Sequence, residues 1–133
     1  MNDLKAVYWD VDGTLADTEI YGHRIAFNMA FKDFELDWDW DINLYKTLLE
    51  VSGGFNRIEK YSQHTDCQLE HSKILEIHKI KQQHYAKILN SGNIPLRLGV
   101  ARMLIELNVM GVEQWIVTTS SRKAIEALLN SSL

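Results

Sequence analysis

The sequence predicts an α/β fold in which a strand–helix–strand unit carries a long helical insertion after its first strand. Two short apolar runs of β-prone residues, 6–9 and 115–117, are typical of buried strands in a parallel sheet. The residues between them follow helical rather than alternating spacing. Parallel sheets usually have more than two strands and are covered on both faces. We therefore expect an incomplete core of about two parallel strands, the front part of a larger protein.

The spacing of apolar residues and glycines predicts the elements in order. After the strand at 6–9, helices are predicted at 21–34, 44–51, a short segment through Ile58 and Tyr61, 69–89 and 100–107, with a last helix that begins near Ser120 or Ser121. The Asp-rich segment 35–41 is predicted to be a loop anchored by Trp38 and Trp40. Met103 and Met110 are expected in the core.

These elements fall into two predicted domains. Residues 1–19 and 93–133 form the α/β core, and residues 20–92 form an all-helical insertion. The only proline, Pro95, and Gly99 mark the connector that returns the chain from the insertion to the core.

Composition excludes several classes of function. The 133 residues carry a formal net charge of −4, so we expect no nucleic-acid partner, although a small anionic ligand fits. The sequence contains no run of 18 consecutive apolar residues, so no membrane-spanning helix is predicted. Cys67 is the only cysteine, which excludes an internal disulfide and suits an intracellular protein, in the cytoplasm or, in a photosynthetic eukaryote, the plastid stroma. His64, His71, His78 and His84 lack zinc-site spacing and are predicted on a solvated face.

Chemistry is predicted where the first strand ends. Residues 9–19 read WDVDGTLADTE, which places Asp10 and Asp12 just beyond an apolar run. Strand periodicity directs both carboxylates to one side, at the edge where α/β sheets bind ligands. One carboxylate can attack phosphorus while the other moves a proton, and Mg²⁺ would offset their repulsion from the phosphate. The alternative is an Asp-Gly turn with solvated acids.

This string resembles the first signature of the haloacid dehalogenase superfamily, whose core is Rossmann-like. The resemblance implies that Asp10 is the nucleophile and Asp12 the acid/base, and that both bind Mg²⁺, Asp12 through its backbone carbonyl. The second signature resembles Trp115 to Thr118, which makes Thr118 the predicted phosphate ligand, with Thr119 and Ser120 beside it. A helix N-cap cluster is the alternative for these hydroxyls, and both roles can hold together.

The helical insertion resembles the cap of the CbbY-like branch of this superfamily, a branch related to β-phosphoglucomutases. The resemblance rests on Gly22-His23-Arg24, Ala26-Phe27-Asn28, Asp37-Trp38, Trp40-Asp41, Leu48-Leu49, Val51, and Gly53-Gly54 with Arg57-Ile58. It implies a phosphatase for a phosphorylated sugar, xylulose-1,5-bisphosphate. Arg57 and Gly54 would bind the distal phosphate, and Glu19 and His23 would face the sugar; a solvated surface role is the alternative for Arg57.

Three departures from the family pattern bear on this expectation. Phe55 and Asn56 stand where the branch usually has Lys-Glu, and Leu98 stands where its connector commonly has Pro. The superfamily also places a lysine and further acids on later strands, which this chain lacks. We expect an N-terminal portion of a longer protein, unless another chain completes the core in an oligomer. The alternatives are a β-phosphoglucomutase-like phosphotransferase and a catalytically inactive fragment that serves as an interaction or structural module.

Overall fold

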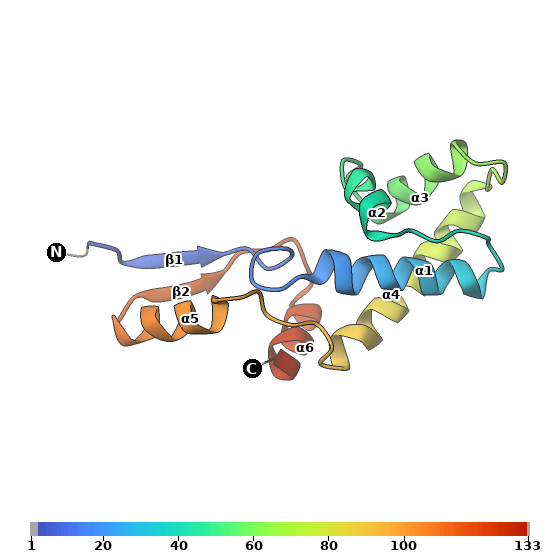
Figure 1. Cartoon of the computed structure of the whole chain (residues 1–133). Helices are drawn as coiled ribbons and strands as arrows, with labels where there is room; N and C mark the ends of the chain where they lie inside the picture. The colour runs from blue at the N-terminus through green and yellow to red at the C-terminus, as the bar shows by residue number, and fades with distance from the viewer. Residues whose placement is uncertain (1–2, 133) are drawn as a thin grey trace.

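A computed structural model describes residues 3–132 and confirms the α/β prediction (Figure 1). Strands β1 (Ala6–Trp9) and β2 (Glu113–Ile116) pair in parallel, with Tyr8 opposite Trp115. The helical insertion begins with a short π-helical segment, η1 (Glu19–His23). The remaining helices are α1 (Arg24–Asp33), α2 (Ile42–Leu48), α3 (Gly54–Gln63), α4 (His71–Asn90), α5 (Val100–Val109) and α6 (Arg122–Ser132).

Among the element boundaries that differ from the predicted ones, two have clear local reasons. β2 begins two residues earlier than predicted, because the N–H of Glu113 already donates to the carbonyl of Lys5 at 3.0 Å. The first two residues of β2 are polar, so the apolar pattern alone does not place them in the strand. Helix α2 begins at Ile42, since the Asp41 carboxylate caps it by accepting the Leu44 N–H at 2.8 Å.

Buried apolar side chains form two clusters. The first cluster consists of aromatic and aliphatic side chains of the insertion. Phe27 and Phe31 of α1 each pack against Trp40, with 4.8 Å between ring centroids. Trp38 and Trp40 are both buried, in agreement with the prediction that they anchor the loop. The second cluster joins the loop after β1 to the connector, α5, α6 and the end of α4; its members are Val11, Leu15, Ala16, Ala26, Tyr85, Leu89, Ile94, Val100, Ile125 and Leu128. The predicted limits of 1–19, 20–92 and 93–133 remain a prediction. Ala26, Tyr85 and Leu89 of the predicted insertion pack in this second cluster with residues of the core.

The prediction that both strands are buried is wrong for one face of the sheet. Tyr8 and Trp115 stand opposite each other and are both exposed. Helix α5 covers the other face, where the Gln114 side chain donates to the carbonyl of Leu104 at 3.0 Å. Met103 and Met110, predicted in the core, are also exposed, whereas Val100 and Leu107 are the buried residues of α5.

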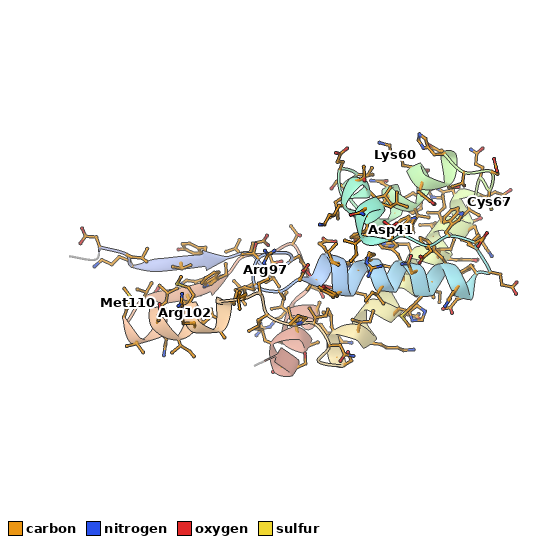
Figure 2. The ribbon with its side chains drawn as sticks, viewed as in Figure 1. Asp41, Lys60, Cys67, Arg97, Arg102 and Met110 are labelled. Atoms are coloured by element: carbon orange, nitrogen blue, oxygen red, sulfur yellow. The ribbon has the colours of Figure 1, made fainter. Side chains whose placement is uncertain are left out.

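The strands and the insertion occupy opposite ends of the molecule. Figure 1 shows β1, β2 and α5 projecting to one side of the helices α1 to α4. In Figure 2, Arg97 lies where the two parts meet, while Arg102 lies on α5 and Met110 directly after its end. Within residues 3–132, every helix is too short or too polar to cross a bilayer.

Candidate active site

A tight loop carries the two aspartates away from the end of β1. The Leu15 N–H donates to the carbonyl of Val11 at 3.0 Å, and Gly13 adopts a φ of +75°, which favours glycine. Arg97 fixes this loop from the connector: its side chain donates to the Gly13 carbonyl at 2.8 Å, and its N–H donates to the Leu15 carbonyl at 2.9 Å. The Val117 N–H donates to the Trp9 carbonyl at 2.9 Å, so the ends of both strands lie together.

The Asp12 carboxylate is the meeting point of the two predicted signature segments. The buried Thr18 hydroxyl donates to Asp12 Oδ1 at 2.5 Å, and the Ser120 hydroxyl donates to Asp12 Oδ2 at 2.6 Å. The Tyr85 hydroxyl donates to Oδ1 at 3.5 Å. Burial, and then the charge of Asp12, raise the pKa of Tyr85, so this phenol remains a donor. The loop after β2 is thereby tied to the loop after β1.

The structure does not bring Asp10 into the same cavity as Asp12. Asp10 is exposed, and its Oδ1 accepts the N–H of Val11 at 2.8 Å. Asp12 instead lines a cavity of about 660 Å³ between the strand ends, α4 and α6, together with Glu19, His23, Thr119, Ser120 and Lys123. Asp10 is not among the residues that line this cavity, so the two carboxylates do not face it together as predicted.

The residues from Thr118 to Ser121 were predicted to bind phosphate, to cap a helix, or both, and their side chains differ in what they contact. Thr118 Oγ1 accepts the N–H of Ser120 at 3.1 Å, which shapes the loop, and Thr118 is absent from the cavity lining. Ser121 is the helix cap, since its Oγ accepts the Ala124 N–H at 3.2 Å. Thr119, Ser120 and Ser121 all line the cavity.

A buried lysine that the sequence analysis missed lies behind His23. Lys81 of α4 is 3% exposed, and its Nζ donates to His23 Nδ1 at 2.8 Å and to Gln82 Oε1 at 3.0 Å. His23 Nε2 lies 3.9 Å from Asp12 Oδ1, and the His23 ring stacks on Tyr85 at 3.8 Å between centroids. The ammonium can only donate, so Nδ1 accepts and Nε2 carries the imidazole proton toward Asp12.

Burial sets the charge states of this pair. Burial, and then the charge of Lys81, lower the pKa of His23 to about 3, against the opposing effect of Asp12. Burial lowers the pKa of Lys81 to about 8, while Glu19 and Asp12 favour its charged form. His23 is therefore neutral at pH 7, and Lys81 is mostly charged.

Arg57 and Gly54 line a second, smaller cavity of about 220 Å³ that shares Glu19 and His23 with the first. Arg57 is only 8% exposed, which excludes the solvated alternative. Its Nε donates to the Leu48 carbonyl at 3.0 Å and its Nη2 to the Val51 carbonyl at 2.9 Å. These bonds hold the guanidinium in place and leave further N–H groups for a ligand, since arginine has five.

The Tyr45 hydroxyl connects Glu19, which lines both cavities, with Arg57, which lines the smaller one. Tyr45 donates to Glu19 Oε2 at 2.9 Å and accepts from Arg57 Nη1 at 3.4 Å. Burial, and then the charge of Glu19, raise the pKa of Tyr45, so its hydroxyl keeps its proton. A chain of polar contacts therefore runs from Arg57 through Tyr45 to Glu19.

The predicted solvated face of the histidines is wrong for His78 and His84. A Cβ on Gly54 would lie 2.8 Å from His78 Nε2, so the close approach of α3 and α4 requires glycine there. Burial lowers the pKa of His78. His84 Nε2 lies 2.6 Å from Asp33 Oδ2. Helix α4 packs against α1, α3 and α6, so more than one of its faces is covered.

The residues that depart from the family pattern lie outside both cavity linings. Phe55 packs against His71 at 4.9 Å between ring centroids, and the Asn56 side chain donates to the Ser52 carbonyl at 3.1 Å. The cations that do reach the cavities are Lys123 in the larger one, and Arg57 and Lys81 in the smaller one.

The oxygen ligands at the end of β1 fit one side of a magnesium site. Mg²⁺ is commonly bound through one or two protein oxygens, with water and substrate phosphate completing the octahedron. Asp10 offers an exposed carboxylate, and the Asp12 carbonyl makes no hydrogen bond recorded among the described residues. Within residues 3–132, no three acidic, histidine or cysteine side chains are grouped to hold a metal. This chain's residues could therefore supply two ligands.

The fold agrees with comparisons to known proteins. The model of the haloacid dehalogenase-like hydrolase family matches residues 4–133, and the chain belongs to that family. Within the family, the chain is similar to CbbY proteins. It is 41% identical to plasmid-encoded CbbY of Cupriavidus necator over 136 residues, which cover 98% of this chain and 53% of that protein. A CBBY-like protein of Arabidopsis thaliana is 34% identical over 97% of this chain and 43% of its own length.

Solved structures of CbbY extend the likeness to three dimensions. CbbY of Rhodobacter sphaeroides in complex with phosphate is 36% identical and superposes with a TM-score of 0.79, over 97% of this chain and 57% of that one. A mutant of the same protein was solved with xylulose-1,5-bisphosphate, at 35% identity and a TM-score of 0.79. The chain therefore spans about half the length of the relatives it matches.

Proposed function

We propose that this chain supplies the reactive end and cap of a magnesium-dependent sugar-phosphate phosphatase. The observation that carries the proposal is the Asp12 carboxylate, which hydroxyls from the loops after both strands hold at the wall of the larger cavity. A hydrogen-bonded carboxylate at the carboxyl ends of parallel strands is suited to protonating a leaving group. The family and the phosphate complex of a relative support the same chemistry.

The proposed reaction proceeds in two displacements. A carboxylate oxygen of Asp10 attacks phosphorus, the bond from phosphorus to the sugar oxygen breaks, and Asp12 gives its proton to that oxygen. Asp12 then takes a proton from water as the water oxygen attacks phosphorus, and the bond from phosphorus to Asp10 breaks to release inorganic phosphate. When bound, Mg²⁺ would screen the phosphate oxygens from the two aspartates.

The paired cavities support a substrate with two phosphates. One phosphate would lie near Thr119 and Ser120, within reach of Asp10 from the end of β1, and the second near Arg57 and Gly54. Glu19 and His23 would face the sugar between them. Thr118 would act by shaping the loop that holds the first phosphate. The complex of a relative with xylulose-1,5-bisphosphate supports this substrate class.

The test is turnover of xylulose-1,5-bisphosphate by the 133-residue chain with Mg²⁺, measured as phosphate release. Turnover that Asp10→Asn abolishes would support the proposal. The matched control is Asp3→Asn, at an exposed acid before β1, which should leave the rate unchanged. Absence of turnover both in this chain and in a version joined to the missing part of CbbY would favour the inactive module.

A phosphotransferase remains the alternative within the same chemistry. It would use the same two aspartates but pass the phosphate to a sugar hydroxyl instead of water. Measuring labelled phosphate in a second sugar against free phosphate separates the two reactions.

A further inference from the structure

A third hollow lies at the end of the insertion farthest from the strands. It has a volume of about 560 Å³ and lies between the segment that follows α1 and the loop that follows α3. Figure 2 shows Cys67, one of its lining residues, at this end of the molecule. The hollow shares no lining residue with either cavity of the candidate active site. We call it the distal hollow, with an apolar floor of Leu36, Trp38 and Tyr61 and an acidic rim of Glu35, Asp37 and Asp66.

The acidic rim has no matching cation. Glu35, Asp37 and Asp66 are all exposed. Among the described residues that line the hollow there is no lysine or arginine, and none of the three carboxylates forms an ion pair within residues 3–132. His64 also lines the hollow, and its Nδ1 lies 2.7 Å from the carbonyl of Lys60. Uncompensated negative charge around a hollow favours a positively charged occupant.

The floor offers an apolar surface with one free donor. Trp38 and Tyr61 pack edge to face, at 5.1 Å between ring centroids. Trp38 is only 8% exposed, yet its indole N–H makes no hydrogen bond recorded among the described residues. That N–H is not enclosed either, because the enclosed unpaired side-chain atoms of the described chain are Trp40 Nε1 and His84 Nδ1. A buried tryptophan usually has a partner for this group, so the indole is left for an acceptor on an occupant.

The main chain beside the hollow points to a polypeptide as the occupant. Trp38 and Trp40 are buried while Asp37 and Asp39 are exposed, which is the alternation of an extended strand. Within the part of the chain that the structure describes, the backbone N–H and carbonyl groups of residues 37–39 make no hydrogen bond. Extended segments with unpaired backbone groups bind a further strand. A small organic cation would leave these groups unpaired.

We propose that the distal hollow is a docking site for an extended basic segment of another protein, in which lysine or arginine alternates with apolar residues. The segment would pair with the backbone of residues 37–39 and pack its apolar side chains on Trp38 and Tyr61. Its cations would lie beside the acidic rim, because opposite charges on neighbouring strands stabilise their pairing. Charge disfavours a second copy of this chain, whose net charge is −4. The docking site is independent of the proposed phosphatase activity.

The test is calorimetry of the 133-residue chain with a synthetic heptapeptide of alternating lysine and valine, blocked at both ends. We expect a one-to-one complex. The double variant Glu35→Gln/Asp66→Asn should raise its Kd at least about tenfold, because it removes two carboxylates of the rim. The matched control is Asp3→Asn/Glu50→Gln, which removes the same charge from two exposed acids outside the hollow and should leave the Kd unchanged.

Modified peptides test the pairing of the backbones. N-methyl groups on every valine, or in a second peptide on every lysine, each block one edge of the strand and keep its charge. One of the two peptides should bind at least about tenfold more weakly than the parent. A peptide with glutamate in place of lysine should not bind.

Four results would overturn the proposal. The first is absence of binding by the lysine–valine peptide at millimolar concentration, and the second is an equal effect of the two double variants. The third is unchanged binding of both N-methylated peptides, which would leave a site for small cations alone. The fourth is a dimer of this chain that Glu35→Gln/Asp66→Asn dissociates, which would assign the hollow to a second copy.

Discussion

Lys81 Nζ lies 2.8 Å from His23 Nδ1, although the two residues are 58 positions apart in the sequence. The contact joins α4 to η1, where the insertion begins. His23 Nε2 in turn lies 3.9 Å from Asp12 Oδ1. A buried ammonium group therefore fixes which ring nitrogen of His23 accepts and which faces the acid. The position of His23 therefore depends on a residue of α4, a helix distant from η1 in the sequence.

Replacing Lys81 by methionine should raise the pKa of His23 above its present value of about 3. Lys81 is the second cause of that low pKa, after burial, and methionine fills a similar volume without charge. The measurement is an NMR titration of the His23 ring. Lys79→Met, at an exposed lysine on the same helix, is the control and should leave His23 unchanged. An unaltered His23 pKa in Lys81→Met would contradict the assignment.

Stability should depend on pH through both members of this pair. The pKa of His23 is about 3 in the folded chain against 6.5 for a free histidine, so between these values the unfolded chain binds more protons. The free energy of unfolding therefore rises with pH across that window. The same sign applies to Lys81 between about 8 and 10.5.

Urea unfolding at pH 4 and pH 7 measures the histidine effect. His23→Gln should reduce the gain in unfolding free energy between these pH values by roughly 1–3 kcal/mol. The comparison variant is His64→Gln, at an exposed histidine, and the difference between the two variants isolates His23. Equal slopes in both variants would show that His23 does not carry the effect.

The sequence predicts the fold better than it predicts the site, and Lys81 shows why. Lys81 stands four residues after Ile77 and four before Tyr85, both buried, so helical spacing alone places it on the apolar face. That signal was available, but only the pairing with His23 shows how a charge is tolerated there. The Asp10 carboxylate accepts the Val11 N–H instead of lining the cavity, and residue spacing does not encode this orientation.

Gly54→Ala should lower the free energy of unfolding by about 1–3 kcal/mol, as overpacking usually does. The added methyl would lie 2.8 Å from His78 Nε2 and 3.2 Å from Phe27 Cζ. Chemical denaturation of Gly54→Ala, His78→Ala and the double variant forms a cycle. The double variant should be more stable than the sum of the single effects, because removing the imidazole makes room for the methyl. Strict additivity would contradict the contact.

Ser120→Ala should lower the turnover number of the proposed phosphatase about tenfold or more, because it removes a hydroxyl that donates to Asp12 Oδ2 at 2.6 Å. Asp41→Ala is the matched control, since Asp41 caps α2 and lines neither cavity. It should cost about 0.5–2 kcal/mol of stability with little change in turnover. Steady-state kinetics and thermal unfolding of both variants separate the two roles, and equal kinetic effects would argue against the role of Ser120.

Arg57 requires a variant that separates binding from folding, because its guanidinium supports the carbonyls of Leu48 and Val51. Arg57→Ala would remove a side-chain donor from both carbonyls, although the Leu48 carbonyl still accepts the Val51 N–H at 3.1 Å. We expect a loss of about 1–3 kcal/mol of stability along with weaker substrate binding. Arg57→Lys keeps the charge but loses the planar fork of donors. It is therefore the sharper test of the distal phosphate site.

If Arg57 binds a second phosphate, Arg57→Lys should raise the KM for a sugar bisphosphate about tenfold and leave the KM for the corresponding monophosphate nearly unchanged. A purely structural role predicts the opposite pattern, in which both substrates lose equally as the cap loosens. Measuring the two KM values at a temperature where circular dichroism shows the variant fully folded removes stability from the comparison. Equal losses would assign Arg57 to holding α2 against α3 rather than to the substrate.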